Sequence, residues 1–236
     1  MVGPLLTRGM LAGFVAGVLA FGFAKLIGEP QVESAIAFEE QMNAAKGEAP
    51  SEPIVSRTVQ SSIGLFTGIV VYGTALGGLF ALVFAVVYGR AGRASPRATA
   101  ALLACAGFIA IVAIPALKYP PNPPSVGMQE TIGYRTGLYF AAILISIAAA
   151  AAALMIARRL AGNCGNWNAA LLGAAAFIAI AAVAQLLLPS INEVPDEFPA
   201  TVLWRFRIAS LGIEFVLWAV IGLLFGTVAE RVLTRQ

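Results

Sequence analysis

The sequence has no histidine, two cysteines and few charged residues. Without histidine, the chain has no imidazole for acid–base chemistry or for binding a metal ion. Cys105 and Cys164 lack the close spacing of a metal-binding pair, and the topology inferred below places them apart, so we predict no disulfide. Charged residues make up 11 % of the 236 residues, against about 25 % in an average globular chain. This shortage of charge predicts a membrane protein.

Sequence motifs of several enzyme classes are also missing. The chain has no G-x-x-x-x-G-K-[ST] loop, no G-x-S-x-G turn, no H-E-x-x-H zinc motif and no C-x-x-C pair. We therefore predict that the chain is not an enzyme, has no catalytic residue and uses neither a cofactor nor a nucleic-acid partner.

The apolar residues are gathered into six long runs. They are Gly9–Ile27, Ile63–Tyr88, Ala98–Leu117, Gly137–Ala157, Ala169–Leu188 and Ile208–Val228. A helix needs about 20 apolar residues to span a bilayer, and these runs lack the alternation of barrel strands. The sequence predicts an all-α, polytopic bundle of six transmembrane helices that forms a single membrane domain over residues 1–236.

Several glycines are spaced four residues apart, which places them on one face of a helix. They are Gly9, Gly13 and Gly17 in the first run, and the pairs Gly64–Gly68 and Gly73–Gly77 in the second. Small residues at this spacing allow two membrane helices to approach closely. We expect helix contacts at all three places.

The polar segments between the runs differ in length and charge. Short loops carry dense arginines, as at Arg90 and Arg97, whereas most acidic residues lie in three longer segments, 29–62, 118–136 and 189–207. Positive residues concentrate on the cytoplasmic side of membrane proteins. We therefore predict that both termini are cytoplasmic and that the three longer segments lie outside. The first of these contains Gln31–Lys46, whose composition predicts a short surface helix.

The segment Lys118–Thr136, KYPPNPPSVGMQETIGYRT, is called the strap below. Its four prolines exclude a regular helix and predict an extended connector. It either fixes two helices as a stiff turn, or lines a pathway or docks a partner. We predict that Arg135, beside Tyr134, bonds to strap carbonyls or to an outer acid. The residues expected to hold the strap and the outer helix ends are Lys118, Pro120, Asn122, Pro123, Tyr134, Arg135, Trp204, Arg205 and Arg207.

Acidic residues are the candidates for attracting or conducting a cation. They are Glu29, Glu39, Glu40, Glu193, Asp196, Glu197 and Glu214. Carboxylate oxygens are the ligands that hard divalent ions prefer. The acids of the outer segments are also compatible with an ordinary surface in contact with water. They therefore do not predict a definite metal site. Glu214 is different because it lies inside the sixth run. An acid there marks a pathway, or else it snorkels to the interface or pairs with Lys25, Lys118 or an outer arginine.

Several blocks of mixed composition resemble one family. They include SRTVQSSIGL at 56–65, LKYPPNPPSVG at 117–127, TIGYRT at 131–136 and FPATVLWRFR at 198–207. In these blocks the chain is similar to the CbtA-type predicted cobalt transporter subunits. The resemblance implies a protein of the bacterial inner (plasma) membrane that imports Co²⁺ as cargo. It also implies a small CbtB-type partner with one membrane span and a histidine-containing end. Many relatives carry histidines in the first outer segment, whereas residues 41–51 of this chain have none.

The sequence is therefore compatible with two functions. The first is a membrane subunit of a transporter for cobalt or another divalent cation. The second is a non-transporting integral membrane scaffold, or accessory subunit, of a larger membrane complex. The acidic outer segments and Glu214 favour the first, and the missing histidine and cysteine ligands favour the second. The sequence leaves the oligomeric state open.

Overall fold

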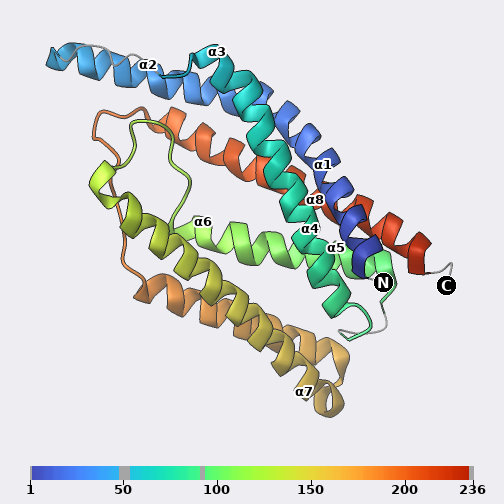
Figure 1. Ribbon diagram of the computed structural model, residues 1–236. Helices are drawn as coiled ribbons and strands as arrows, with labels where there is room; N and C mark the ends of the chain where they lie inside the picture. Colours follow the sequence, from blue (N-terminus) through green and yellow to red (C-terminus); the bar gives the residue numbers. More distant parts are fainter. Residues whose placement is uncertain (1, 48–53, 91–93, 234–236) are drawn as a thin grey trace. The chain divides into compact units, whose positions relative to one another are not determined.

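The computed structural model describes residues 2–47, 54–90 and 94–233, and this part of the chain is helical, without a strand (Figure 1). Residues 48–53 of the first predicted outer segment lie outside the described part. The chain forms two compact units. The first comprises residues 1–108, 122–125 and 196–236, and the second comprises residues 109–121 and 126–195. The predicted all-α class is confirmed.

The long helices of the first unit are extended by π-helical turns. Helix α1 (Val2–Phe23) continues through η1 (Ala24–Gly28) into α2 (Glu29–Lys46). Helix α3 (Arg57–Val59) continues through η2 (Gln60–Gly64) into α4 (Leu65–Val87). The unit also contains α5 (Pro96–Gly107) and α8 (Ala200–Leu233).

The second unit begins within a third π-helical turn, η3 (Phe108–Ala113), which leads into α6 (Ile114–Lys118). After the strap and the short η4 (Gln129–Thr131) comes α7 (Ile132–Leu187), where the chain doubles back on itself (Figure 1). The reversal lies at Gly165, whose φ of 79° and ψ of 161° are not helical. Glycine reaches this conformation without the steric cost that a side chain brings.

Among the described residues, five helical stretches are long and apolar enough to cross a membrane. They are Val2–Lys46, Arg57–Val87, Pro96–Lys118, Gln129–Leu187 and Ala200–Leu233. The predicted count of six is not confirmed, because the fourth and fifth runs lie in one stretch interrupted at Gly165. Its two legs are packed tightly, since a Cβ added to Gly173 would lie 2.8 Å from the Ala153 carbonyl oxygen.

Helix boundaries extend beyond the apolar runs. Helix α8 begins at Ala200 rather than Ile208, and the second stretch begins at Arg57 rather than Ile63. Polar residues can continue a helix once it leaves the hydrocarbon, so an apolar run marks only the part inside it. The surface helix predicted over Gln31–Lys46 is present as α2, without a break from α1.

The contact between α1 and α4 is made by glycines. A Cβ added to Gly9 or Gly77 would overlap the main chain of the facing helix, and one added to Gly73 would lie 2.8 Å from the Gly13 carbonyl oxygen. The close approaches predicted for the first stripe and for Gly73–Gly77 are confirmed. The prediction for Gly64–Gly68 is wrong, because nothing lies within 4 Å of a Cβ at Gly68.

Helix α8 supplies the aromatic and aliphatic core of the first unit. Leu217, Ile221 and Phe225 are fully buried, and the Phe225 ring meets the Phe80 and Phe84 rings of α4 edge-on, at 5.5 and 5.0 Å between centroids. On another face, α8 approaches α5 through small residues, as at Gly222. This packing fixes the position of Glu214, one turn from Trp218.

We expect Gly13→Ala to destabilise the folded protein by about 1–3 kcal/mol, because its new Cβ meets the main chain of α4, which cannot move aside. Thermal unfolding in detergent measures the change. Gly22→Ala on the same helix is the matched control, since nothing lies within 4 Å of its Cβ and alanine favours a helix. Equal stability of the two variants would contradict the contact.

Candidate functional site

The strap is tied to the end of α7 within the second unit. The Lys118 ammonium donates to the Gln185 carbonyl oxygen at 2.8 Å and to the Ser190 hydroxyl at 3.0 Å. The Tyr119 hydroxyl donates to the Pro189 carbonyl oxygen at 2.8 Å. The Gln185 carbonyl is among those that the end of a helix leaves without a main-chain partner, and Pro189 directly follows that end.

Glu193 binds the other end of the strap. One of its oxygens accepts from the Met128 main-chain N–H at 2.8 Å and from the Thr131 hydroxyl at 2.9 Å, and Arg135 Nε lies 3.4 Å from the same oxygen. Arg135 also donates to the Met128 carbonyl oxygen at 3.2 Å. Both kinds of contact predicted for Arg135 are therefore present. Tyr134 beside it is exposed.

The environment of Glu193 favours its charged form. The Met128 N–H lowers the pKa of the carboxyl most, followed by the Thr131 hydroxyl, with a further contribution from the Arg135 charge. Only 8 % of the Glu193 side chain is exposed. This carboxylate holds the strap and is largely covered, which leaves little of it to meet a passing cation.

The first unit contains a similar pairing of arginine and acid. Arg57, at the start of α3, forms an ion pair with Glu29 at the start of α2, and the Glu29 side chain is 7 % exposed. Arg207 of α8 donates to the Asn122 side-chain oxygen at 2.9 Å, beside the buried Pro123. Glu29 is thus another predicted cation-attracting acid that is engaged by an arginine.

Four of the predicted acids remain exposed in the first unit: Glu39, Glu40, Asp196 and Glu197, which we call the acidic rim. The rings of Phe38 and Phe198 meet edge-on at 5.0 Å and join the two segments that carry them. Within the described ranges, no three acidic or cysteine side chains could together hold a metal ion. The acidic rim can therefore attract a cation by charge but offers no coordination cage.

Glu214 is an acid inside the apolar part of α8. The side chains of Tyr72 and Trp218 lie beside its carboxyl group and can donate to it. Its Oε2 is buried and has no hydrogen-bond partner among the described residues. The ion pairs found in that part of the chain do not include Glu214, and Lys25 is exposed. A carboxyl oxygen in this state can accept a proton or contact an ion.

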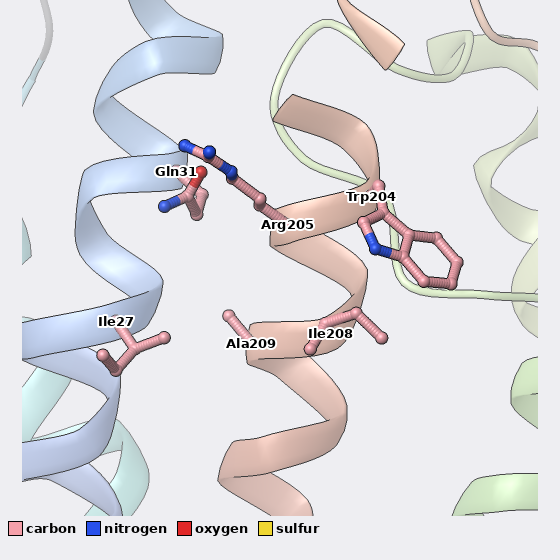
Figure 2. A pocket seen from close by; sticks show the side chains of 6 residues that line it. All are labelled: Ile27, Gln31, Trp204, Arg205, Ile208 and Ala209. Carbon is pink, nitrogen blue, oxygen red and sulfur yellow. The ribbon is translucent and has the colours of Figure 1, made fainter. Parts of the chain in front are cut away.

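A hollow of about 320 Å³ lies between the α1–α2 stretch and the start of α8. Its lining residues are Ile27, Gln31, Trp204, Arg205, Ile208 and Ala209. Figure 2 shows the Gln31 and Arg205 side chains at one end and the Ile27 and Ala209 side chains nearer the other. Trp204 and Arg205 were predicted as anchors of a helix end, and the hollow between helices was not predicted.

Sequence reasoning also missed the partners of the outer arginines. Arg57 and Glu29 are 28 positions apart, and Arg207 and Asn122 are 85 positions apart. The available signal was an arginine near the start of each helix that follows an outer segment. That signal identifies the donor but contains nothing about the acceptor.

Glu193 should make stability depend on pH. Its pKa is lowered in the folded state, so the unfolded chain binds more protons, and stability is lost as the pH falls through the folded pKa. Over about pH 6 to 3, around the usual carboxyl range, we expect the melting temperature of Glu193→Gln to fall less than that of the parent. Glu130→Gln, at an exposed acid of the same segment, is the control and should follow the parent. Parallel curves for all three proteins would contradict this role.

Comparison with known proteins identifies the family of this chain. No curated protein and no solved structure matches the chain. A family described as "probable cobalt transporter subunit (CbtA)" matches residues 2–230, nearly the whole sequence. This agrees with the blocks of resemblance in the sequence and with the five helices, in the part of the chain that the structure describes, that are long and apolar enough to cross a membrane. The chain belongs to the CbtA family of probable cobalt transporter subunits.

Proposed function

We propose that the chain is the membrane subunit of a system that carries Co²⁺, or a divalent cation like it, and that Glu214 is the acidic step inside the membrane. The observation that carries this proposal is the buried Glu214 oxygen without a hydrogen-bond partner in the described part of the chain. An acid in a membrane helix is costly, and by default it belongs to a pathway or a pair. Tyr72 and Trp218 lie beside the Glu214 carboxyl group, but both are neutral, and no ion pair of the described residues includes Glu214. The lack of a charged partner favours a pathway.

The acidic rim would be the first place at which the cation meets the protein. Its four carboxylates are exposed and lie on two segments joined by the Phe38–Phe198 contact. A negative surface raises the local concentration of cations, an effect that salt weakens. The rim needs no tight coordination, because an ion that is transported must also be released.

Ligands for Co²⁺ would come from a second protein. The chain has no histidine, and its described acids and cysteines form no cluster of three. Imidazole is a common ligand for divalent transition metals, whereas carboxylates suit harder ions. A small single-span CbtB-type subunit with a histidine-containing end would supply the missing donors. The family description as a subunit supports such a partner.

The topology that fits this function has six crossings. The two legs of α7, separated at Gly165, would each cross, so both termini would lie in the cytoplasm of a bacterial cell and the strap would lie outside its inner membrane. The dense arginines of the short loops support this orientation. The acidic rim would then lie on the side from which a cation enters.

A non-transporting scaffold is the second candidate. Tight glycine packing between α1 and α4 and the lack of a metal-holding cluster in the described residues favour it. Deletion of the chain distinguishes the scaffold from the transporter. If the chain is a scaffold and a partner alone carries the ion, cobalt uptake remains unchanged when the chain is deleted.

We expect Glu214→Gln to lower cobalt uptake about tenfold, because it removes the charge while keeping the size and hydrogen bonding of the side chain. Uptake of radiolabelled cobalt into cells that express the chain and its partner measures the effect. Glu130→Gln, at an exposed acid, is the control and should transport like the parent. If Glu214→Gln transports normally at equal protein level, Glu214 is structural. If deletion of the chain has no effect, the scaffold is the function.

The topology can be tested with single cysteines in a background of Cys105→Ala and Cys164→Ala. Met128→Cys in the exposed part of the strap should react with an impermeant reagent from outside. Gly162→Cys, beside the reversal in α7, should react only after the cytoplasm is opened. Reaction of both residues from the same side would mean that the two legs of α7 do not cross separately.

A further inference from the structure

The hollow between the α1–α2 stretch and α8 has a polar end and an apolar end. Ile27 and Gln31 are four residues apart on one helical stretch, and Arg205 and Ala209 are four apart on α8, so each pair lies along one face. Figure 2 shows Gln31 and Arg205 together at one end, with Ile27 and Ala209 one turn further along. The lining of the hollow is thus polar at one end and apolar at the other.

The polar end presents hydrogen-bond donors. The Arg205 and Gln31 side chains lie together at this end (Figure 2), and Trp204 also belongs to the lining. Arg205 is exposed, and the ion pairs of the described residues do not include it. A planar guanidinium beside further donors suits a phosphate group. No acid lines the hollow, so a cation has no partner there.

The position along α8 places these donors at headgroup depth. The helix runs over Ala200–Leu233, and Arg207 and Glu230 bracket its apolar part, residues 208–229. That part is about 33 Å long at 1.5 Å per residue, close to the thickness of a hydrocarbon core of about 30 Å. Arg205 lies one turn beyond its end. Trp204, which is 66 % exposed, is a residue type that favours this interface.

The apolar end then lies inside the hydrocarbon. Ile27 and Ile208 are each 48 % exposed, although both are large and apolar. A membrane-spanning partner helix would contact a strip about 30 Å long, whereas the pairs along this hollow extend about 6 Å on each helix. The short length and the polar end together favour a lipid over a helix.

We propose that this hollow binds one phospholipid, with its phosphate on Arg205 and Gln31 beside Trp204, and the start of an acyl chain against Ile27, Ile208 and Ala209. The lining of the hollow includes neither Glu214 nor a residue of the acidic rim, and the proposal does not depend on transport. A lipid with an anionic headgroup would be attracted more strongly than a zwitterionic one, because the polar end of the hollow carries a net positive charge.

Native mass spectrometry of the full chain in detergent, titrated with phosphatidylglycerol, tests the site. We expect one lipid adduct to resist mild activation in the parent. Arg205→Gln should reduce its occupancy about tenfold, as the loss of a charge-assisted bond implies. Ile208→Trp should reduce it by filling the apolar end. Glycerol 3-phosphate, which has the phosphate without acyl chains, should not displace the lipid.

Lys25→Gln is the matched control, because Lys25 is an exposed cation two residues from Ile27 that does not line the hollow. It should retain the adduct. Equal loss in Lys25→Gln and Arg205→Gln would reveal nonspecific attraction and overturn the site, as would an unchanged adduct in Arg205→Gln. A dimer that disappears in Ile208→Trp, without a lipid adduct in the parent, would assign the hollow to a second copy and also overturn it.

A second measurement keeps the test open if Arg205→Gln does not fold. Phosphatidylglycerol with brominated acyl chains should quench the fluorescence of the parent more than that of Trp204→Phe. Quenching that is the same in both proteins would contradict a lipid beside Trp204.

Discussion

The close approach of α1 and α4 is the constraint on which the first unit depends. At Gly13 and Gly73 the two main chains leave no room for a side chain. Lipid tails are as apolar as the helix surfaces, so helices in a membrane associate through such close packing rather than by escaping water. Helix α8 contacts this pair through Leu217, whose side chain would touch a Cβ at Gly73 at 3.1 Å. The position of Glu214 is therefore set by residues that carry no functional group.

The polar groups next to the three longer polar segments share one arrangement. Arg57, Arg135 and Arg207 each lie near the start of a helix that follows one of these segments, and each bonds to a residue outside that helix turn. Two of the partners are carboxylates, Glu29 and Glu193. In both pairs the acid is more deeply covered than the arginine. The acids that bond to these arginines and the acids that remain exposed are thus different residues.

The sequence was a good guide to structure that depends on local composition. Apolar runs located the spanning helices, because the bilayer sets a minimum length, and four-residue spacing located the α1–α4 contact. The sequence did not predict the features that depend on contacts between distant parts of the chain. Gly64 and Gly68 have the same spacing as Gly73 and Gly77, but no described helix covers them. The hydrogen-bond partners of Glu193 and Arg207 lie more than 60 positions away, beyond any local pattern.

The π-helical turn η1 changes how α1 and α2 can vary in length. A π turn contains one more residue than an α-helical turn, so Ala24–Gly28 acts as a one-residue insertion in a continuous helix. Deleting any one residue of this turn would restore ordinary α-helical spacing without shortening the chain noticeably. Because the π turn absorbs the extra residue, the side chains of α2 would then keep nearly the same directions relative to α1. If the residue were kept but the turn wound as an α-helix, everything after it would rotate by about 100°. Glu29 would then turn away from Arg57, and Gln31 would leave the hollow beside Arg205. The directions of the side chains in α2 therefore depend on the wider winding of this one turn.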